Sequence, residues 1–154
     1  MTIWGETGVP EPEPAYPRPL LQRDGSTWAS LNGVWQLDRT PKSFDDPPFG
    51  VDLPEEILVP FPIESPLSGV RNLTDHDYAW YRTVVGRGRL QPLGTEGLRT
   101  VLHFEASDYN TTVFVNGEYM GWHSGGYDPF DFDVTDVLGS DYSCVATDFP
   151  NDLS

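Results

Sequence analysis

Alternating apolar and polar residues between Thr100 and Leu138 constrain the fold more than any other feature of this 154-residue chain. The runs Leu102–Ala106 and Phe130–Thr135 both alternate, which is the period of a strand with one buried face. Residues 111–115 are β-branched and aromatic, a composition that favours a half-buried strand. The pattern predicts a β-sheet built by short antiparallel connections.

The dipeptide Asn116-Gly117 lies between the run 111–115 and the short run 118–120. Asn and Gly tolerate the positive φ angles of a two-residue type I′ turn better than other residues. The sequence therefore predicts a β-hairpin at this point, with residues 118–120 in the returning strand.

Composition agrees with an all-β fold in one domain. The 15 glycines and 15 prolines favour turns and short strands over long helices. A hydrophobic content of 38% with 13% aromatic residues is typical of a folded chain. A (β/α)8 barrel needs about 250 residues, so these 154 residues are too few to contain one.

The formal net charge of −15 argues against nucleic acid and anionic membranes as partners, because both bind basic surfaces. No apolar run is long enough to span a bilayer. The single cysteine, Cys144, excludes an intrachain disulfide and fits a reducing compartment. Residues 1–19 lack the features of a signal peptide, so we expect a cytoplasmic protein.

Several motifs together resemble one family. The longest are Val113-Phe114-Val115-Asn116-Gly117 and His123-Ser124-Gly125-Gly126-Tyr127-Asp128-Pro129-Phe130, and shorter ones are Leu31-Asn32-Gly33-Val34-Trp35, Val59-Pro60-Phe61-Pro62 and Trp80-Tyr81-Arg82. They resemble the N-terminal sugar-binding domain of family 2 glycoside hydrolases, the β-galactosidase and β-glucuronidase group. The resemblance implies a jelly-roll β-sandwich that precedes a catalytic (β/α)8 barrel, and a role in carbohydrate metabolism. The barrel is absent from these residues.

The chain divides into three parts on this interpretation. Residues 1–19 form a proline-rich arm, for which we expect an extended conformation. Residues 20–138 form the sandwich, in which Trp35 is predicted to anchor the core. The resemblance ends after Leu138, and residues 139–154 are predicted to be a divergent, disordered tail. A sandwich that lacks its C-terminal strands exposes an unpaired edge, so we also expect weak stability and self-association.

No catalytic residue is assigned. Retaining glycosidases use two carboxyl groups about 5–5.5 Å apart. The resemblance places both on glutamates of the barrel, one of them in an Asn-Glu dipeptide, and no such dipeptide occurs in this sequence. The adjacent carboxylates Glu55 and Glu56 are expected to point apart or to face solvent. We therefore predict that the chain alone is inactive, and we predict no cofactor.

Five residues are candidates for sugar contact. Trp122, His123 and Tyr127 flank Gly125-Gly126, and their rings and polar atoms could stack on a sugar and bind its hydroxyls. The usual burial of aromatic residues favours instead a lid over the sandwich core. His76 and Asp77 precede the Trp80-Tyr81-Arg82 strand, in a loop that the resemblance places near the neighbouring active site; a solvated loop is the alternative.

Metal sites are not predicted. His76 has no second histidine at ligand spacing. The aspartates at 128, 131, 133 and 136 do not follow the spacing of an EF-hand loop, and we interpret them as a polar strand face.

Two functions remain after these exclusions. The chain is either the sugar-binding domain of a glycoside hydrolase, or a free-standing module that binds carbohydrate or another protein. A domain that packs on a barrel needs an extensive apolar patch, whereas a free module should expose a compact set of aromatic and polar groups.

Overall fold

The computed structural model describes residues 28–39, 47–71, 78–86, 98–138 and 142–148. The described residues form eight strands and two single-turn 3-10 helices, which confirms the predicted all-β class. The strands are β1 Gly33–Asp38, β2 Glu55–Val59, β3 Trp80–Gly86, β4 Val101–Phe104, β5 Asn110–Val115, β6 Glu118–Ser124, β7 Phe130–Asp133 and β8 Tyr142–Asp148; the 3-10 turns are η1 Pro66–Ser68 and η3 Thr135–Val137. No helix in these ranges is long and apolar enough to cross a membrane.

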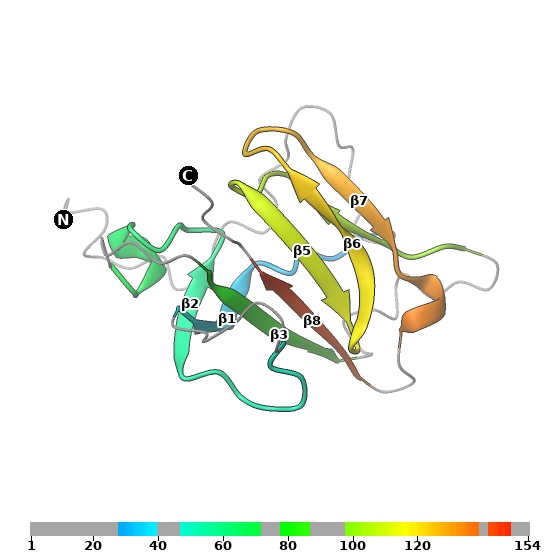
Figure 1. Cartoon of the computed structure of the whole chain (residues 1–154), viewed down its shortest axis with the longest axis horizontal. Helices are drawn as coiled ribbons and strands as arrows, with labels where there is room; N and C mark the ends of the chain where they lie inside the picture. The colour runs from blue at the N-terminus through cyan, green and yellow to red at the C-terminus, as the bar shows by residue number, and fades with distance from the viewer. Residues whose placement is uncertain (1–27, 40–46, 72–77, 87–97, 139–141, 149–154) are drawn as a thin grey trace.

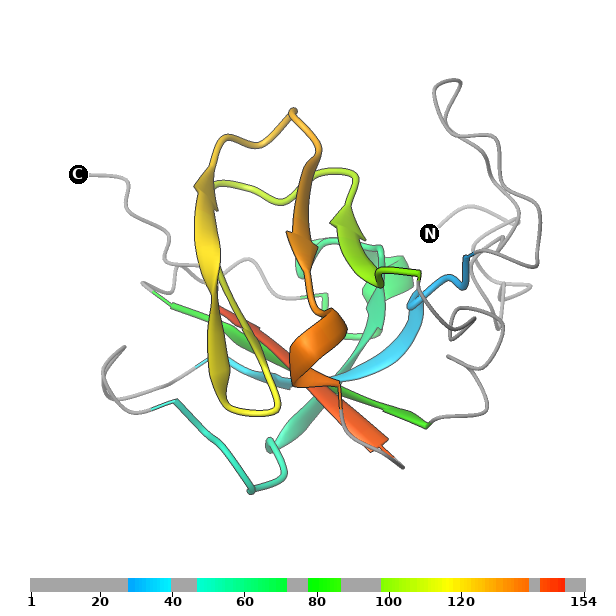
Figure 2. The same ribbon diagram turned by 90° about the vertical axis from the view of Figure 1, so that its right-hand side faces the viewer.

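Two antiparallel sheets make up the fold. The larger has the strand order β2-β1-β3-β8-β5-β6, and the smaller pairs β4 with β7. Figure 1 shows β8 between β3 and β5. In Figure 2, β5 and β6 rise from the layer of β1, β3 and β8, while β4 and β7 stand opposite them. The arrangement is the β-sandwich that the sequence predicted.

The core lies between the two sheets. Trp35 and Leu37 are buried on the inner face of β1, and the Trp35 indole Nε1 donates a hydrogen bond to the Leu31 carbonyl oxygen at 2.8 Å. This arrangement confirms that Trp35 anchors the core. The buried residues packed with them are Ile57, Ile63, Ala79, Val85, Val115, Val134 and Val145.

An ion pair lies at the start of strand β2. Glu55 and Glu56 are the first residues of the strand. Glu55 lies opposite Leu37 and accepts two hydrogen bonds from Arg39, at 3.0 Å from Nε and 2.6 Å from Nη2. This bidentate pair fixes the first residue of the strand. Glu56 is exposed on the other face, so the two carboxylates point apart as predicted.

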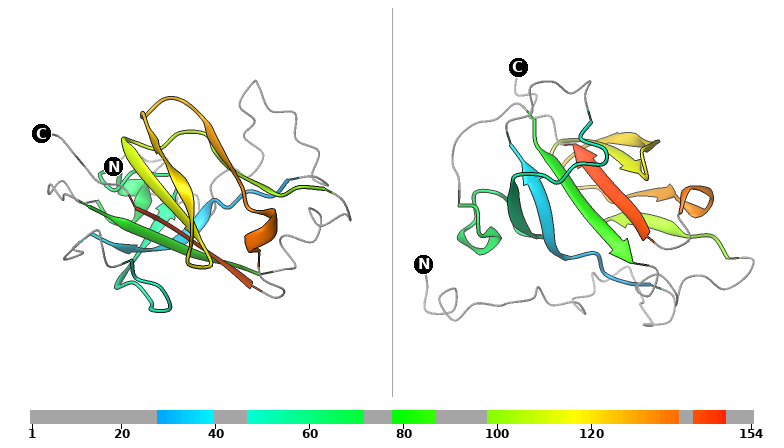
Figure 3. Two further views of the ribbon diagram at one scale, coloured as in Figure 1. Left: turned by 45° about the vertical axis from the view of Figure 1, so that its right-hand side comes forward. Right: turned by 90° about the horizontal axis from the view of Figure 1, so that it is seen from below.

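The prediction of a disordered tail is wrong for residues 142–148. They form β8, which pairs with β3 over seven residues and with β5 over four. Figure 3 shows β8 alongside β3 in the larger sheet. A strand with partners on both sides receives its backbone hydrogen bonds from its neighbours, so it needs little apolar signal of its own. Residues 139–141 and 149–154 lie outside the described ranges.

The predicted hairpin is confirmed. Val115 pairs with Glu118, and the two residues between them have positive φ angles, 52° at Asn116 and 86° at Gly117. Both angles are those that a type I′ turn requires. The Asn116 side-chain amide also donates to the Val137 carbonyl oxygen at 2.7 Å, which joins the turn to η3.

We predict that Gly117→Val lowers the free energy of unfolding by about 1–3 kcal/mol, the usual scale of local backbone strain. No atom lies within 4 Å of a Cβ at this position, so the cost comes from the φ angle and not from a clash. Chemical denaturation measures it, with Glu118→Gln as the control because Glu118 is exposed. Equal losses in the two variants would mean that the turn lies elsewhere.

A second prediction tests β8. Val145 is 5% exposed, whereas Val84 on the neighbouring strand β3 is 50% exposed. Val145→Ala should cost about 2 kcal/mol, because it removes two buried methyl groups and leaves a cavity. Val84→Ala should change the free energy of unfolding by less than about 0.5 kcal/mol. Urea denaturation followed by tryptophan fluorescence compares them, and a neutral Val145→Ala would contradict the placement of β8 in the core.

Candidate functional site

Two connections meet at one end of the sandwich. Residues 105–109 join β4 to β5, and residues 125–129 join β6 to β7. The Gly125 amide donates to the Tyr109 carbonyl oxygen at 2.8 Å. At Gly126 a Cβ would lie 2.8 Å from the Asp108 Oδ1 atom, so a larger residue would require the exposed Asp108 side chain to move. We call this pair of connections the end loops.

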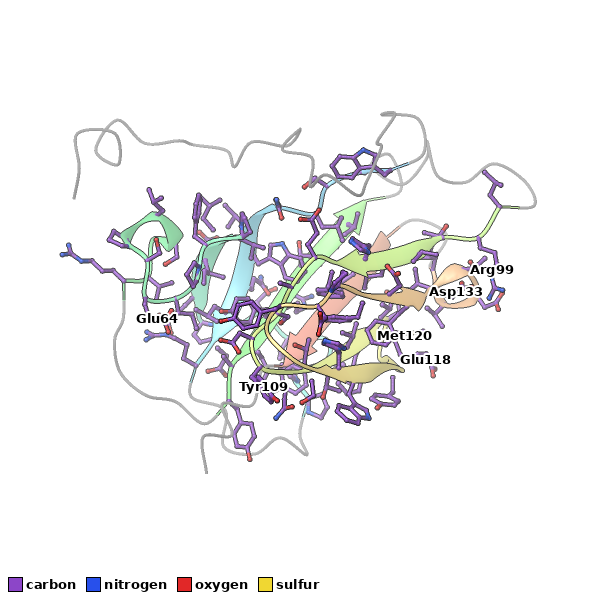
Figure 4. The ribbon with its side chains drawn as sticks, turned by 90° about the horizontal axis from the view of Figure 1, so that it is seen from above. Glu64, Arg99, Tyr109, Glu118, Met120 and Asp133 are labelled. Atoms are coloured by element: carbon purple, nitrogen blue, oxygen red, sulfur yellow. The ribbon has the colours of Figure 1, made fainter. Side chains whose placement is uncertain are left out.

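The end loops expose two tyrosines. Tyr109 is 54% exposed and Tyr127 is 93% exposed. Figure 4 shows Tyr109 well apart from the Arg99–Asp133 ion pair. Two exposed phenol rings on a pair of connections joined by a backbone hydrogen bond offer flat apolar faces and hydroxyl groups to a ligand.

His123 is half-buried and its ring points inward from β6. Its ring stacks on Phe130 with centroids 4.2 Å apart, and Phe130 in turn stacks on Phe104 at 4.8 Å. The three rings come from β6, β7 and β4, so the stack connects the two sheets below the end loops. The His123 Nε2 atom is buried and has no hydrogen-bond partner among the described residues. The lid interpretation is therefore correct for His123.

Trp122 points the other way. It lies opposite Thr112 in the β5–β6 ladder, on the outer face of the larger sheet, and is 65% exposed. The structure thus places Trp122 and His123 on opposite faces of β6 and Tyr127 on an end loop, so the three predicted residues do not form one site. The lid interpretation is wrong for Trp122 and Tyr127. His76 and Asp77 lie outside the described residues.

The aspartates of β7 face outward, as the polar-face interpretation predicts. Asp133 accepts hydrogen bonds from the Thr135 hydroxyl at 2.7 Å and the Thr135 amide at 3.0 Å, and it forms an ion pair with Arg99. The Thr135 bonds and, to a lesser extent, Arg99 hold the pKa of Asp133 below its usual value. Asp131 lies 2.5 Å from His103 Nδ1. Within the described ranges, no three His, Cys, Asp or Glu side chains are grouped as a metal site requires.

A polar network crosses the outer face of the larger sheet. The Gln36 amide donates to Asp52 Oδ1 at 2.9 Å, and Arg82 Nη1 donates to Gln36 Oε1 at 2.5 Å and to Asp52 Oδ1 at 3.1 Å. The Gln36 bond and then the Arg82 contacts lower the pKa of Asp52. The Leu53 amide donates to Gln36 Oε1 at 3.2 Å. These bonds hold the segment before β2 against the sheet.

The comparisons with known proteins agree with the geometry. The profile of the family described as glycosyl hydrolases family 2, sugar binding domain, matches residues 40–147. The chain belongs to this family. The match includes most of β8, beyond the point at which we expected the resemblance to end.

Two β-galactosidases are similar in sequence. The large subunit of the Latilactobacillus sakei β-galactosidase is 26% identical over 165 aligned residues, covering 84% of this chain and 26% of that protein. The Thermoanaerobacter pseudethanolicus β-galactosidase is 44% identical over 43 residues, covering 28% of this chain and 6% of that protein.

Solved β-glucuronidases share the fold. The Bifidobacterium dentium enzyme complexed with coumarin-3-O-glucuronide has a TM-score of 0.64 and 25% identity, covering 80% of this chain and 20% of that one. The Ruminococcus gnavus enzyme has a TM-score of 0.61 and 22% identity, covering 79% and 21%. The family 2 sugar-binding chain described here therefore spans about a quarter or less of these proteins.

Sequence reasoning missed Tyr109, Asn110 and Tyr119. Asn110 is the first residue of β5, and its carboxamide oxygen accepts a hydrogen bond from the Ser124 hydroxyl. The signal that could have found Tyr109 is its position directly before a β-branched strand, where an end loop must lie.

We predict that His123→Ala lowers the free energy of unfolding by about 1–2 kcal/mol, because it removes the ring that stacks on Phe130. His123→Phe should restore the stability, since it keeps the stack and removes the unpartnered nitrogen. Tyr127→Ala, at an exposed position, should change stability by less than about 0.5 kcal/mol. Thermal denaturation measures all three, and a greater loss in Tyr127→Ala than in His123→Ala would contradict the assignment.

Proposed function

We propose that this chain is part of a family 2 glycoside hydrolase that cleaves β-linked O-glycosidic bonds, and that its end loops contact the carbohydrate. The observation that carries the proposal is the pair of exposed tyrosines, Tyr109 and Tyr127, on hydrogen-bonded loops of a domain of the sugar-binding family. The relatives named as β-galactosidases and β-glucuronidases support β-glycosides as the substrate class.

The chain contributes substrate contact and not proton transfer. A general acid at neutral pH needs a raised carboxyl pKa. The described carboxyls with a shifted pKa, Asp52 and Asp133, are both shifted downward, because each accepts hydrogen bonds and lies beside an arginine. Asp52 and Asp133 therefore stay ionised and do not suit the role of the acid. We propose that the two carboxyls of glycoside hydrolysis lie in another part of the enzyme.

We predict that the purified 154-residue chain hydrolyses no aryl β-galactoside, β-glucuronide or β-mannoside. The control is a triple variant, Glu64→Gln with Asp75→Asn and Asp77→Asn, which removes the acidic groups nearest the Trp80-Tyr81-Arg82 strand in sequence. Turnover by the parent chain that disappears in the triple variant would reveal an active site within the chain and would overturn this division of roles.

Binding at the end loops is tested separately. Methyl β-galactoside and methyl β-glucuronide should bind at about millimolar affinity, because an isolated domain supplies only part of a pocket. In ¹H–¹⁵N spectra, titration should shift the amide signals of Tyr109, Gly125 and Tyr127. Tyr127→Ala should abolish these shifts. Val84→Ala, at an exposed position on β3 away from the end loops, is the control and should preserve them.

The proposal also covers partners and location. We place the enzyme in the cytoplasm and infer weak self-association through a free sheet edge. Because β8 is present and paired, the edge strands in the described part are β2 and β6 in one sheet and β4 and β7 in the other. Sedimentation velocity tests this inference, and a monomer at all accessible concentrations would refute it.

A further inference from the structure

We propose that the outer face of the β5–β6 hairpin binds an uncharged oligosaccharide chain by stacking it on Trp122 and Tyr119. The two rings lie on a sheet face, whereas Tyr109 and Tyr127 lie on the end loops. We call these two rings the aromatic platform.

An irregularity in the β5–β6 ladder creates the platform. Trp122 and Tyr119 are three residues apart, and in a regular strand they would point to opposite faces. The ladder, however, pairs Val113 with Gly121 and Phe114 with Tyr119, so Met120 is an extra residue on β6. Such a bulge reverses the alternation. Both rings therefore lie on the outer face, about 7 Å apart as judged from the two-residue spacing of their partners on β5.

Neighbouring rings hold Tyr119 in place. Phe114, directly opposite Tyr119, has its ring centroid 5.6 Å from that of Tyr119, 5.8 Å from that of Trp80 and 5.3 Å from that of Phe49. Phe49 comes from the segment that the Gln36–Asp52–Arg82 network fastens to the sheet. A ring supported in this way loses little conformational entropy on binding, which favours ligand stacking.

Exposure and polar groups fit a sugar chain. Trp122 and Tyr119 are 65% and 57% exposed, and both combine an apolar face with a hydrogen-bonding edge. Asn110 and Ser124 lie on the same face, one ladder step beyond Thr112 and Trp122. The Asn110 oxygen accepts from Ser124, which leaves the Asn110 amide nitrogen without a partner among the described residues. Pyranose rings present C–H groups on their faces and hydroxyls around their rims, and this combination matches them.

Charge indicates the class of sugar. The net charge of −15 repels uronate polymers and sulfated glycans. Arg82, the arginine of β3 on this face, is already bonded to Gln36 and Asp52. The platform therefore suits a neutral chain. Val34 on β1 and Val84 on β3 are also exposed aliphatic residues. The strands β8 and β5 lie between them and β6, so these two valines are not part of the aromatic platform.

Native affinity electrophoresis of the 154-residue chain tests the proposal. Gels contain β-1,4-galactan or galactomannan as neutral probes, and polygalacturonate as the anionic comparison. We expect retardation by at least one neutral probe and none by polygalacturonate. Trp122→Ala and Tyr119→Ala should each weaken retardation about tenfold. Trp122→Phe should retain part of it. Val84→Ala, an exposed apolar residue elsewhere on the outer face, should bind as the parent does.

The outcomes separate this inference from the proposed function. Tyr127→Ala should leave polymer retardation unchanged while it removes the response to methyl glycosides. Loss of retardation in Tyr127→Ala but not in Trp122→Ala would overturn the platform and support the end loops alone. Absence of retardation by the neutral probes would overturn the proposal. If Trp122→Ala changes the sedimentation of the chain but not its glycan binding, the platform is a protein interface and the proposal is overturned as well. Thermal denaturation of each variant establishes that it is folded.

Discussion

The pairing of β8 with both β3 and β5 joins the larger sheet. Without it, β2-β1-β3 and β5-β6 are two separate groups of strands, and Val145 no longer packs with Trp35 and Val115 in the core. An isolated two-stranded hairpin such as β5–β6 is at best marginally stable, whereas a sheet of three or more strands with a covered apolar face can be stable. Both candidate binding surfaces depend on β5 and β6, so they depend on β8 as well.

A single extra residue decides how β6 presents its side chains. Counting outward from the Asn116-Gly117 turn in a regular ladder, Trp122 would point inward and His123 outward. The bulge at Met120 exchanges them, so His123 stacks on Phe130 and Trp122 faces solvent. One irregularity thus completes the core at the end loops and, on the opposite face, exposes the rings to which we assign oligosaccharide binding.

The fold was largely predictable because its signals are local. Alternation in residues 102–106 and 130–135, the Asn116-Gly117 turn and the buried Trp35 each follow from the sequence within a few residues, and all agree with the structure. β8 was missed because its strand partners lie 30 to 68 residues away in sequence, and short-range patterns do not record such pairing. The family match over residues 40–147 includes residues 142–147, which the local pattern left out.

The site was harder to predict than the fold. The sequence pointed to the aromatic and polar residues around Gly125-Gly126. It could not show that Trp122, His123 and Tyr127 lie in three different surroundings, because the hydrophobic pattern does not reveal the bulge in β6. The close contact of Gly126 with Asp108 likewise depends on two loops meeting in space.

Amide hydrogen exchange of the 154-residue chain tests most directly whether one continuous sheet supports both surfaces. If β8 joins the sheet, the hydrogen-bonded amides of residues 143–147 should exchange as slowly as those of β3 and β5, through the same global opening. Exchange of residues 143–147 at the rate of an unstructured peptide, while β1 and β3 stay protected, would show that β8 does not join the two halves and would contradict the account.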